Sequence, residues 1–295
     1  MTPIDFLAAN PAWFIASVGV LGLLVGSFLN VVIYRLPVMM EREWRNQCHE
    51  MLQLDAASNT PAERFDLILP GSRCGQCGRH LRALENIPVI SYLVLRGKCA
   101  GCRCTISPRY PIIELVSGVL SAVVAWHYGF TIATAAALFL TWALICLTMI
   151  DFDHQLLPDS ITLPFLWLGL TLSLFAVFAD PRASIIGAIA GYLSLWSVYW
   201  VFKMVTGKEG MGHGDFKLLA MLGAWTGWDL LLATILLSSL VGAIVGIGLI
   251  VLRGRDKNIP IPFGPYLATA GWITLLWGNE LKHAYMSFIL ASPPI

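Results

Sequence analysis

The sequence is short of charge. Asp, Glu, Lys and Arg make up 13% of its 295 residues, whereas soluble domains carry about 25%. The net charge is +1, and no basic cluster alternates with aromatic residues, so the pattern of a nucleic-acid-binding protein is missing. No G-x-G-x-x-G follows a predicted strand, which argues against a Rossmann-type cofactor site. What remains is a chain that is 57% hydrophobic and suited to a membrane.

Runs of about 20 apolar residues predict transmembrane helices. We expect eight of them and therefore an all-α, polytopic membrane protein. They lie near residues 12–34, 111–128, 131–150, 160–179, 183–202, 216–227, 229–252 and 263–290. The first run starts too deep in the chain for a signal peptide, lacks a basic segment before it, and has no A-x-A-like site after it. It predicts a retained helix.

The distribution of Lys and Arg predicts the orientation, because cytoplasmic loops carry an excess of positive charge. Eleven of the nineteen Lys and Arg lie within residues 35–110. If this segment is cytoplasmic, the loops 203–217 and 253–257, with three basic residues each, are cytoplasmic as well. Only Arg182 and Lys282 then fall on the other side. We expect the N-terminus to face the outer side of the membrane.

Three segments follow from this topology. Residues 1–34 form the first transmembrane helix, residues 35–110 a small cytoplasmic insert between helices 1 and 2, and residues 111–295 the remaining membrane core. The same count places the loop 151–159 on the cytoplasmic side.

The insert contains two CxxC motifs separated by twenty-one residues. They supply the four thiols of Cys74, Cys77, Cys99 and Cys102. Two such motifs at this separation are typical of a four-cysteine zinc ribbon, in which thiolates close a tetrahedron. Two disulfides are the alternative, but a cytoplasmic compartment keeps thiols reduced. A redox CxxC would need a thioredoxin-like βαβ context, which is missing. We expect a structural Zn²⁺ with no open position for catalysis.

Three further cysteines stand outside this pattern. Cys104 follows the second motif by two residues and could compete as a ligand, but we interpret it as a bystander. Cys146 falls inside the third apolar run and is expected to pack in the core. Cys48 has no partner in the pattern.

Two aspartates stand where apolar runs meet the cytoplasmic face. Asp151 ends the third run, and Asp215 opens the sixth after a glycine-rich stretch. Ionisable residues at a membrane boundary are costly and mark functional sites by default. A pair of carboxylates on one face could share a proton and activate a water molecule. We predict Asp151 and Asp215 as a catalytic pair.

The neighbouring polar residues have simpler interpretations. Asp159 precedes Ser160 and an apolar run, which is typical of a helix N-cap. Asp153 lies further into the loop and is expected to be solvated. His213, beside Asp215, could act as a base or a ligand but is more often solvated, and Lys217 could pair with an acid or a lipid phosphate.

Seven segments occur together in a recognisable order. They are GSFLNVVIYRLP (26–37), LPGSRCGQC (69–77), RGKCAGC (96–102), YPIIEL (110–115), DFDHQLLPD (151–159), GHGD (212–215) and PFGPYLA (262–268). Together they resemble the bacterial type IV prepilin peptidases, which are leader peptidases and N-methyltransferases of the GxGD intramembrane aspartyl protease group. The resemblance runs from about residue 20 to residue 270.

The resemblance implies a bacterial inner-membrane enzyme that acts on type IV prepilins or pseudopilins. It would cut their short basic leader after a glycine and methylate the new N-terminal residue, usually phenylalanine, with S-adenosylmethionine as donor. It also implies Asp151 and Asp215 as the catalytic aspartates and the four CxxC cysteines as zinc ligands. Cys104 is a departure from the family pattern. No residue is assigned to S-adenosylmethionine; Glu114, at the junction of insert and helices, is a candidate.

Other classes of protein are compatible with parts of the sequence. A polytopic transporter would also carry a few membrane acids and glycine-broken helices, but no inverted repeat is visible and the acids lie at one face. A non-catalytic scaffold could dock a cytoplasmic partner through a zinc ribbon. A signal-peptide-peptidase-like protease would share the GxGD motif but would lack the four-cysteine insert.

Overall fold

The computed structural model describes residues 2–52, 64–208, 210–253 and 262–291. Within these ranges the regular structure is helical, and the extended pairings are two isolated β-bridges in the insert. The chain forms two compact units, Met1–Phe130 and Thr131–Ile295. The prediction of an all-α protein is confirmed.

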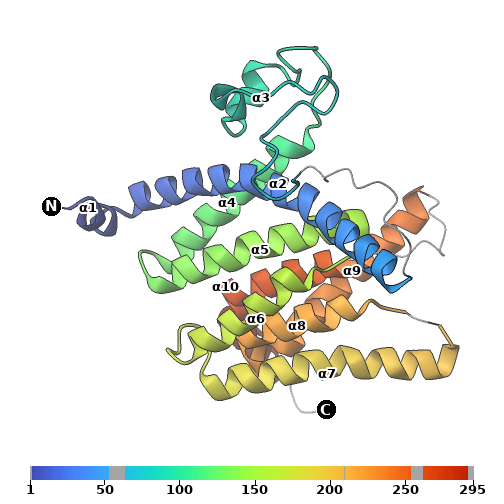
Figure 1. Cartoon of the computed structure of the whole chain (residues 1–295). Helices are drawn as coiled ribbons and strands as arrows, with labels where there is room; N and C mark the ends of the chain where they lie inside the picture. The colour runs from blue at the N-terminus through green and yellow to red at the C-terminus, as the bar shows by residue number, and fades with distance from the viewer. Residues whose placement is uncertain (1, 53–63, 209, 254–261, 292–295) are drawn as a thin grey trace. The chain divides into compact units, whose positions relative to one another are not determined.

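The first unit is built on two long helices (Figure 1). Its elements are α1 (Pro3–Ala9), α2 (Pro11–Met51), the 3₁₀ turn η1 (Ala83–Asn86), α3 (Ile90–Val94) and α4 (Arg109–Tyr128). The helix α2 continues well beyond residue 34, where the first apolar run ends. The polar last turns of α2 therefore lie within residues 35–110, the predicted insert, but they continue the first helix.

Small residues bring α2 and α4 into close contact. A side chain at Gly22 would meet the Ser121 hydroxyl at 2.5 Å, and one at Gly26 would meet the backbone of Glu114 at 2.7 Å. The hydroxyl of Ser117 donates a hydrogen bond to the carbonyl of Gly22 at 2.7 Å. Such small-residue contacts are how helices approach each other where no hydrophobic effect drives them together.

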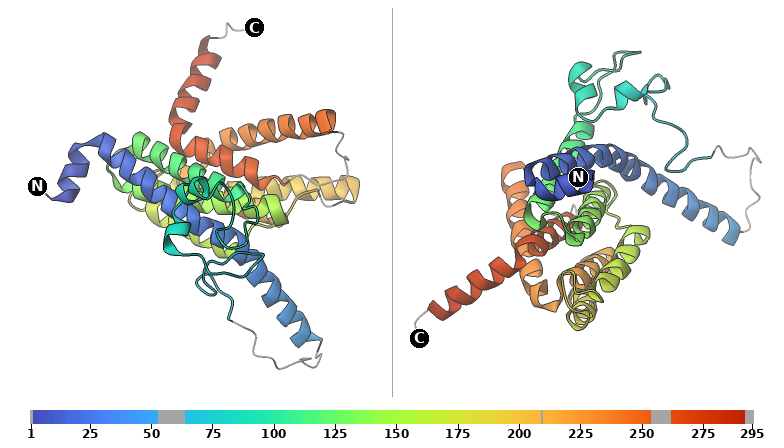
Figure 2. Two further views of the ribbon diagram at one scale, coloured as in Figure 1. Left: turned by 90° about the horizontal axis from the view of Figure 1, so that it is seen from above. Right: turned by 90° about the vertical axis from the view of Figure 1, so that its left-hand side faces the viewer.

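In the part of the second unit that the structure describes, there are six α-helices and a 3₁₀ turn. They are α5 (Ile132–His154), α6 (Asp159–Ser173), α7 (Pro181–Thr206), α8 (His213–Thr226), η2 (Trp228–Leu230), α9 (Leu231–Arg253) and α10 (Gly264–Ala291). The short helix α8 packs against α6, α7 and α10; Figure 1 shows it beside α6 and α7, and Figure 2 gives two further views of the chain. Its contact with α7 is close because Gly187 and Gly223 face each other there.

The core of the second unit lies around α8. Phe216, Leu218, Leu219, Met221 and Leu222 are fully buried, so α8 is apolar on all sides and not on one stripe. A helix of 14 residues is about 21 Å long, which is less than the hydrocarbon core of a bilayer. The structure therefore holds the start of α8, where Asp215 lies, inside a bundle of longer helices.

Each of the eight predicted transmembrane segments coincides with part of a described helix. Among the described residues, five stretches are long and apolar enough to cross a membrane, namely Pro11–Met51, Arg109–Tyr128, Ile132–His154, Pro181–Thr206 and Trp228–Gly248. The count of eight stays a prediction. Helix α6 ends at Ser173, earlier than expected, and most of the predicted loop 253–257 lies outside the described residues.

Candidate active site and metal centre

Three helix ends meet at the two predicted catalytic aspartates. Asp151 lies in the last turn of α5, which ends when Gln155 adopts a left-handed conformation and donates its N–H to the Asp151 carbonyl at 2.9 Å. Asp215 lies in the first turn of α8. The third end is the start of α10, where the backbone N–H of Gly264 donates a hydrogen bond to the Asp151 carboxylate. Both carboxylates therefore lie beside a helix N-terminus, which favours negative charge.

Both carboxylates are withdrawn from solvent. Asp151 is 5% exposed and Asp215 is 7% exposed, and the two are close enough to interact electrostatically. The Oδ2 atom of Asp151 is buried and has no hydrogen-bond partner among the described residues. Buried polar atoms are nearly always satisfied, so this oxygen is available for a water molecule, a shared proton or a substrate group.

Glycine makes the approach of these segments possible. A side chain at Gly264 would meet Oδ2 of Asp151 at 2.5 Å and Cδ2 of Leu157 at 3.3 Å. A side chain at Gly214, beside Asp215, would meet Cβ of Leu157 at 2.8 Å. The Leu157 side chain thus packs against both Gly214 and Gly264.

The polar residues around the pair differ in part from expectation. Asp159 was predicted as the N-cap of α6, which is wrong, because Pro158 holds that position and Asp159 is the first helical residue. Its carboxylate instead accepts hydrogen bonds from the Lys217 ammonium at 2.6 and 2.8 Å, which joins α6 to α8. Asp153 is exposed. His213 is exposed as well, and its ring packs at a tilt against that of Tyr199, with ring centroids 5.1 Å apart.

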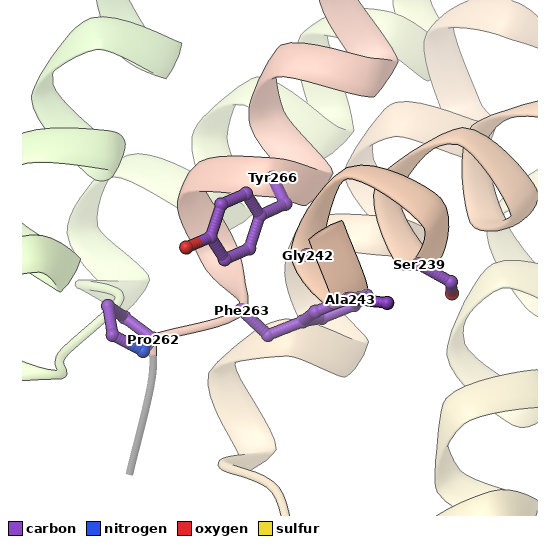
Figure 3. A pocket seen from close by; sticks show the side chains of 6 residues that line it. All are labelled: Ser239, Gly242, Ala243, Pro262, Phe263 and Tyr266. Atoms are coloured by element: carbon purple, nitrogen blue, oxygen red, sulfur yellow. The ribbon is translucent and has the colours of Figure 1, made fainter. Parts of the chain in front are cut away.

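A pocket of about 280 Å³ lies between α9 and the start of α10. It is lined by Ser239, Gly242, Ala243, Pro262, Phe263 and Tyr266 (Figure 3). One wall is the small-residue face of α9 and the other carries the two aromatic rings. Because Phe263 immediately precedes Gly264, the pocket begins one residue from the N–H group that binds Asp151.

The insert brings its thiols together. The Sγ atoms of Cys74, Cys99, Cys102 and Cys104 all lie within 4.8 Å of one another, and Cys77 interacts with the thiols of the first three. No disulfide forms, since all seven cysteines are free. A ZnS₄ tetrahedron with Zn–S bonds of about 2.3 Å separates its sulfurs by about 3.8 Å. The Sγ–Sγ separations of 3.8 Å for Cys74–Cys102 and 3.5 Å for Cys74–Cys104 fit such a site.

Backbone N–H groups prepare the first thiol of each motif for a cation. The N–H groups of Cys77 and Gln76 lower the pKa of Cys74 to about 6. Those of Cys102 and Gly101 lower the pKa of Cys99 in the same way. Because the thiolate is the metal-binding form, the chemistry of the site fits a soft divalent metal such as Zn²⁺.

The remaining predicted residues take structural positions. Cys146 is buried in α5, which confirms its expected place in the core, and Cys48 is exposed on α2. Glu114 is buried in α4 and accepts a hydrogen bond from the N–H of Val89 at 2.8 Å. This contact gives Glu114 a role in tying the insert to α4.

Arg35 anchors the insert to α2 and was missed in the sequence. Its buried guanidinium donates to the carbonyls of Asp66 at 2.9 Å and Pro70 at 2.5 Å. Sequence reasoning counted Arg35 only as one of many positive charges. The signal that could have found it is its position at the end of an apolar run, where a charge has to find partners.

Replacing Arg35 by Gln is expected to loosen the insert. Each of the two lost charge-assisted hydrogen bonds contributes about 1.5–3 kcal/mol to stability. The two carbonyls also lose their partner. Hydrogen exchange of residues 64–82 should accelerate. Arg45→Gln is the matched control, because Arg45 makes an exposed pair with Glu41 of little energetic weight. Equal protection in both variants would show that Arg35 does not hold the insert.

The fold and site together define a helical protein with membrane-crossing segments, a pair of buried aspartates and a thiol-rich insert. Family models identify it further: the bacterial peptidase A24 N-terminal domain matches residues 20–128, and the type IV leader peptidase family matches residues 138–247. The chain belongs to the type IV leader peptidase family.

Curated relatives agree over nearly the whole length. Proteins named prepilin leader peptidase/N-methyltransferase are 58% identical in Stutzerimonas stutzeri and 55% identical in Pseudomonas aeruginosa, each covering 98% of this chain and 99% of the relative. The relative of the same name in Dichelobacter nodosus is 50% identical and covers 92% of this chain and 94% of its own. No solved structure matches the chain.

Proposed function

We propose that this protein cleaves the leader of type IV prepilins or pseudopilins with Asp151 and Asp215 as the catalytic pair, and then methylates the new N-terminal residue. The observation that carries the proposal is the convergence of two buried carboxylates, one with an unpartnered oxygen, at the ends of α5, α8 and α10. The type of reaction, leader cleavage followed by methylation, is proposed from the family to which the chain belongs.

The mechanism is general acid–base catalysis by the two carboxylates. Two negative charges at close range are unfavourable, so the pair holds one proton. The ionised carboxylate takes a proton from water as the water oxygen bonds to the scissile carbonyl carbon, and the protonated one donates to the carbonyl oxygen. The C–N bond then breaks as the carboxyl group that took the proton from water passes it to the leaving amine, and the other carboxylate takes a proton from a hydroxyl of the gem-diol, which restores the pair. The unpartnered Oδ2 of Asp151 offers a position for the water or for the shared proton.

The site is best placed at the cytoplasmic face of the bacterial inner membrane, with the N-terminus in the periplasm. The end of α5, the start of α8 and the start of α10 carry the reacting groups, and Lys217 lies on the same turn of α8 as Asp215. A pilin helix in the bilayer would keep its basic leader on this positively charged side. In this arrangement residues 35–110 form the cytoplasmic insert between residues 1–34 and the core, 111–295.

The pocket beside Gly264 gives the substrate a place for an apolar side chain. Its volume of about 280 Å³ and its lining of aromatic and small residues suit an aromatic ring. We assign it to the first residue of the mature pilin, which is usually phenylalanine, because that residue directly follows the scissile bond and the pocket begins one residue from Gly264. The pocket would then align the substrate with the carboxylates.

The metal of the insert is proposed to be structural. Cys74, Cys77, Cys99 and Cys102 would hold Zn²⁺ and leave it no open coordination position. A small loop-rich segment gains much of its folding free energy from such a metal. Zinc therefore takes no part in the cleavage step.

Methyl transfer would use S-adenosylmethionine as donor. The described residues contain no β-strand beyond two isolated bridges, so a Rossmann-type site does not fit this part of the chain. Glu114 stays a candidate residue for this step; its Oε2 atom accepts a hydrogen bond from the N–H of Val89 at 2.8 Å.

The experiment that tests the proposal combines purified protein with a prepilin that has Gly–Phe at its leader junction, read out by intact mass. We expect loss of the leader with wild type and, when S-adenosylmethionine is added, a gain of one methyl group. Cleavage without methylation would confine the protein to peptidase activity. An uncut substrate with folded protein would contradict the proposal and favour a transporter or a non-catalytic scaffold.

A further inference from the structure

The two CxxC segments have the same backbone geometry with an offset of 25 residues. We call residues 73–80 the first knuckle and residues 98–105 the second. Isolated β-bridges close both, Arg73 with His80 and Lys98 with Thr105. In both, the first cysteine donates its N–H over 2.9 Å to the carbonyl five residues on, Cys74 to Arg79 and Cys99 to Cys104. A positive φ also recurs, at Gly78 and Arg103.

This correspondence places Cys104 where the first knuckle has Arg79. The Arg79 side chain crosses to the second knuckle, where its Cδ lies 3.2 Å from the position of a Cβ on Gly101, and it ends in an ion pair with Glu85. Cys104 crosses in the opposite sense, and its Sγ lies 3.5 Å from the Sγ of Cys74. The same position thus points at the partner knuckle in both cases, but in the second knuckle it carries a thiol.

Five thiols consequently compete for four positions on a metal. Cys74, Cys99 and Cys102 are common to two possible sets of ligands. One set is completed by Cys104, whose Sγ lies within 4.8 Å of all three. The other is completed by Cys77, which interacts with the same three thiols. Since a structural Zn²⁺ takes four ligands, one of these two cysteines is always left off the metal.

We propose that Cys104 is a metal ligand that exchanges with Cys77 at the fourth position of the site. The inference rests on the proposed metal site and extends its set of ligands from four to five. The metal is then retained when either exchanging cysteine is lost, and the thiol off the metal is accessible to reagents in solution, because Cys77 is exposed and Cys104 is half-buried.

The first test measures bound Zn²⁺ in full-length protein after gel filtration with a chelator. Wild type, Cys77→Ser and Cys104→Ser should each keep one Zn²⁺ per chain, whereas the double variant should lose it. Cys48→Ser is the matched control, because Cys48 is exposed on α2 outside the cluster. If Cys77→Ser alone loses the metal as fully as the double variant, Cys104 is not a ligand. A wild type without metal would refute the proposed metal site itself.

A second test uses the wild type and so does not depend on how the variants fold. The zinc-loaded protein is treated with iodoacetamide, unfolded, and cut with trypsin after Arg73, Arg79 and Arg103, which separates Cys104 from the second CxxC motif. We expect partial alkylation of both Cys77 and Cys104 and protection of the three common ligands. Full alkylation of Cys104 with protection of Cys77 would overturn the exchange.

Replacement of Zn²⁺ by Co²⁺ gives an independent spectroscopic readout. Thiolate–cobalt charge-transfer bands should report four sulfurs in Cys77→Ser and in Cys104→Ser. Weaker bands in Cys77→Ser, indicating three sulfurs, would contradict ligation by Cys104.

Discussion

Asp215→Asn is expected to abolish leader cleavage. Methylation of a substrate that already lacks its leader should stay normal. Asn keeps the size of the side chain but can neither take a proton from water nor donate a carboxylic proton, and loss of such a group costs about 10²–10⁴-fold in rate. Because the variant keeps the packing of the buried first turn of α8, the protein should remain folded. Asp151→Asn is expected to behave in the same way.

The measurement is single-turnover cleavage of a prepilin, followed by methylation of the matching mature pilin by the same preparation. Asp153→Asn is the control, since Asp153 is exposed two residues from Asp151 and should cleave normally. Normal cleavage by Asp215→Asn would remove this residue from the mechanism. Loss of methylation together with cleavage would instead indicate a folding defect.

Patterns that are local in the sequence predicted the main features of the site. The apolar runs place Asp151 and Asp215 at helix ends, and the structure brings them together with the start of α10. The spacing of the CxxC motifs predicted the thiol cluster in the same way. The charge-based topology restricts both aspartates to one membrane face, and the short spacing within each CxxC motif holds its two thiols on one turn.

Contacts between distant segments could not be predicted in this way. The N-cap assigned to Asp159 failed because its neighbour Pro158 takes that position and because Lys217, 58 residues away, supplies a partner. Cys104 was set aside because a spacing rule carries no information on the direction of a side chain. Its approach to Cys74 depends on two knuckles facing each other, which only the folded insert provides.

The glycines of the GHGD segment differ in importance, although the motif treats them alike. A Cβ at Gly214 would lie 2.8 Å from Cβ of Leu157, closer than real Cβ contacts allow, whereas one at Gly212 would meet only Oδ2 of Asp215 at an ordinary 3.9 Å. The nearest atom to Gly214 is a Cβ and cannot rotate away. Relief therefore requires a backbone shift next to Asp215.

Gly214→Ala should therefore reduce kcat/KM for leader cleavage by about 100-fold, the effect expected when a reacting group moves by about 1 Å. The overlap should also destabilise the fold by about 1–3 kcal/mol. Gly212→Ala should stay within a few-fold of wild type, because its φ of −77° is allowed for alanine. Cleavage kinetics and thermal unfolding of the two variants decide the matter: equal losses would mean that the GHGD glycines act through loop flexibility, whereas a selective loss at Gly214 would show that close contact with Leu157 sets the position of Asp215.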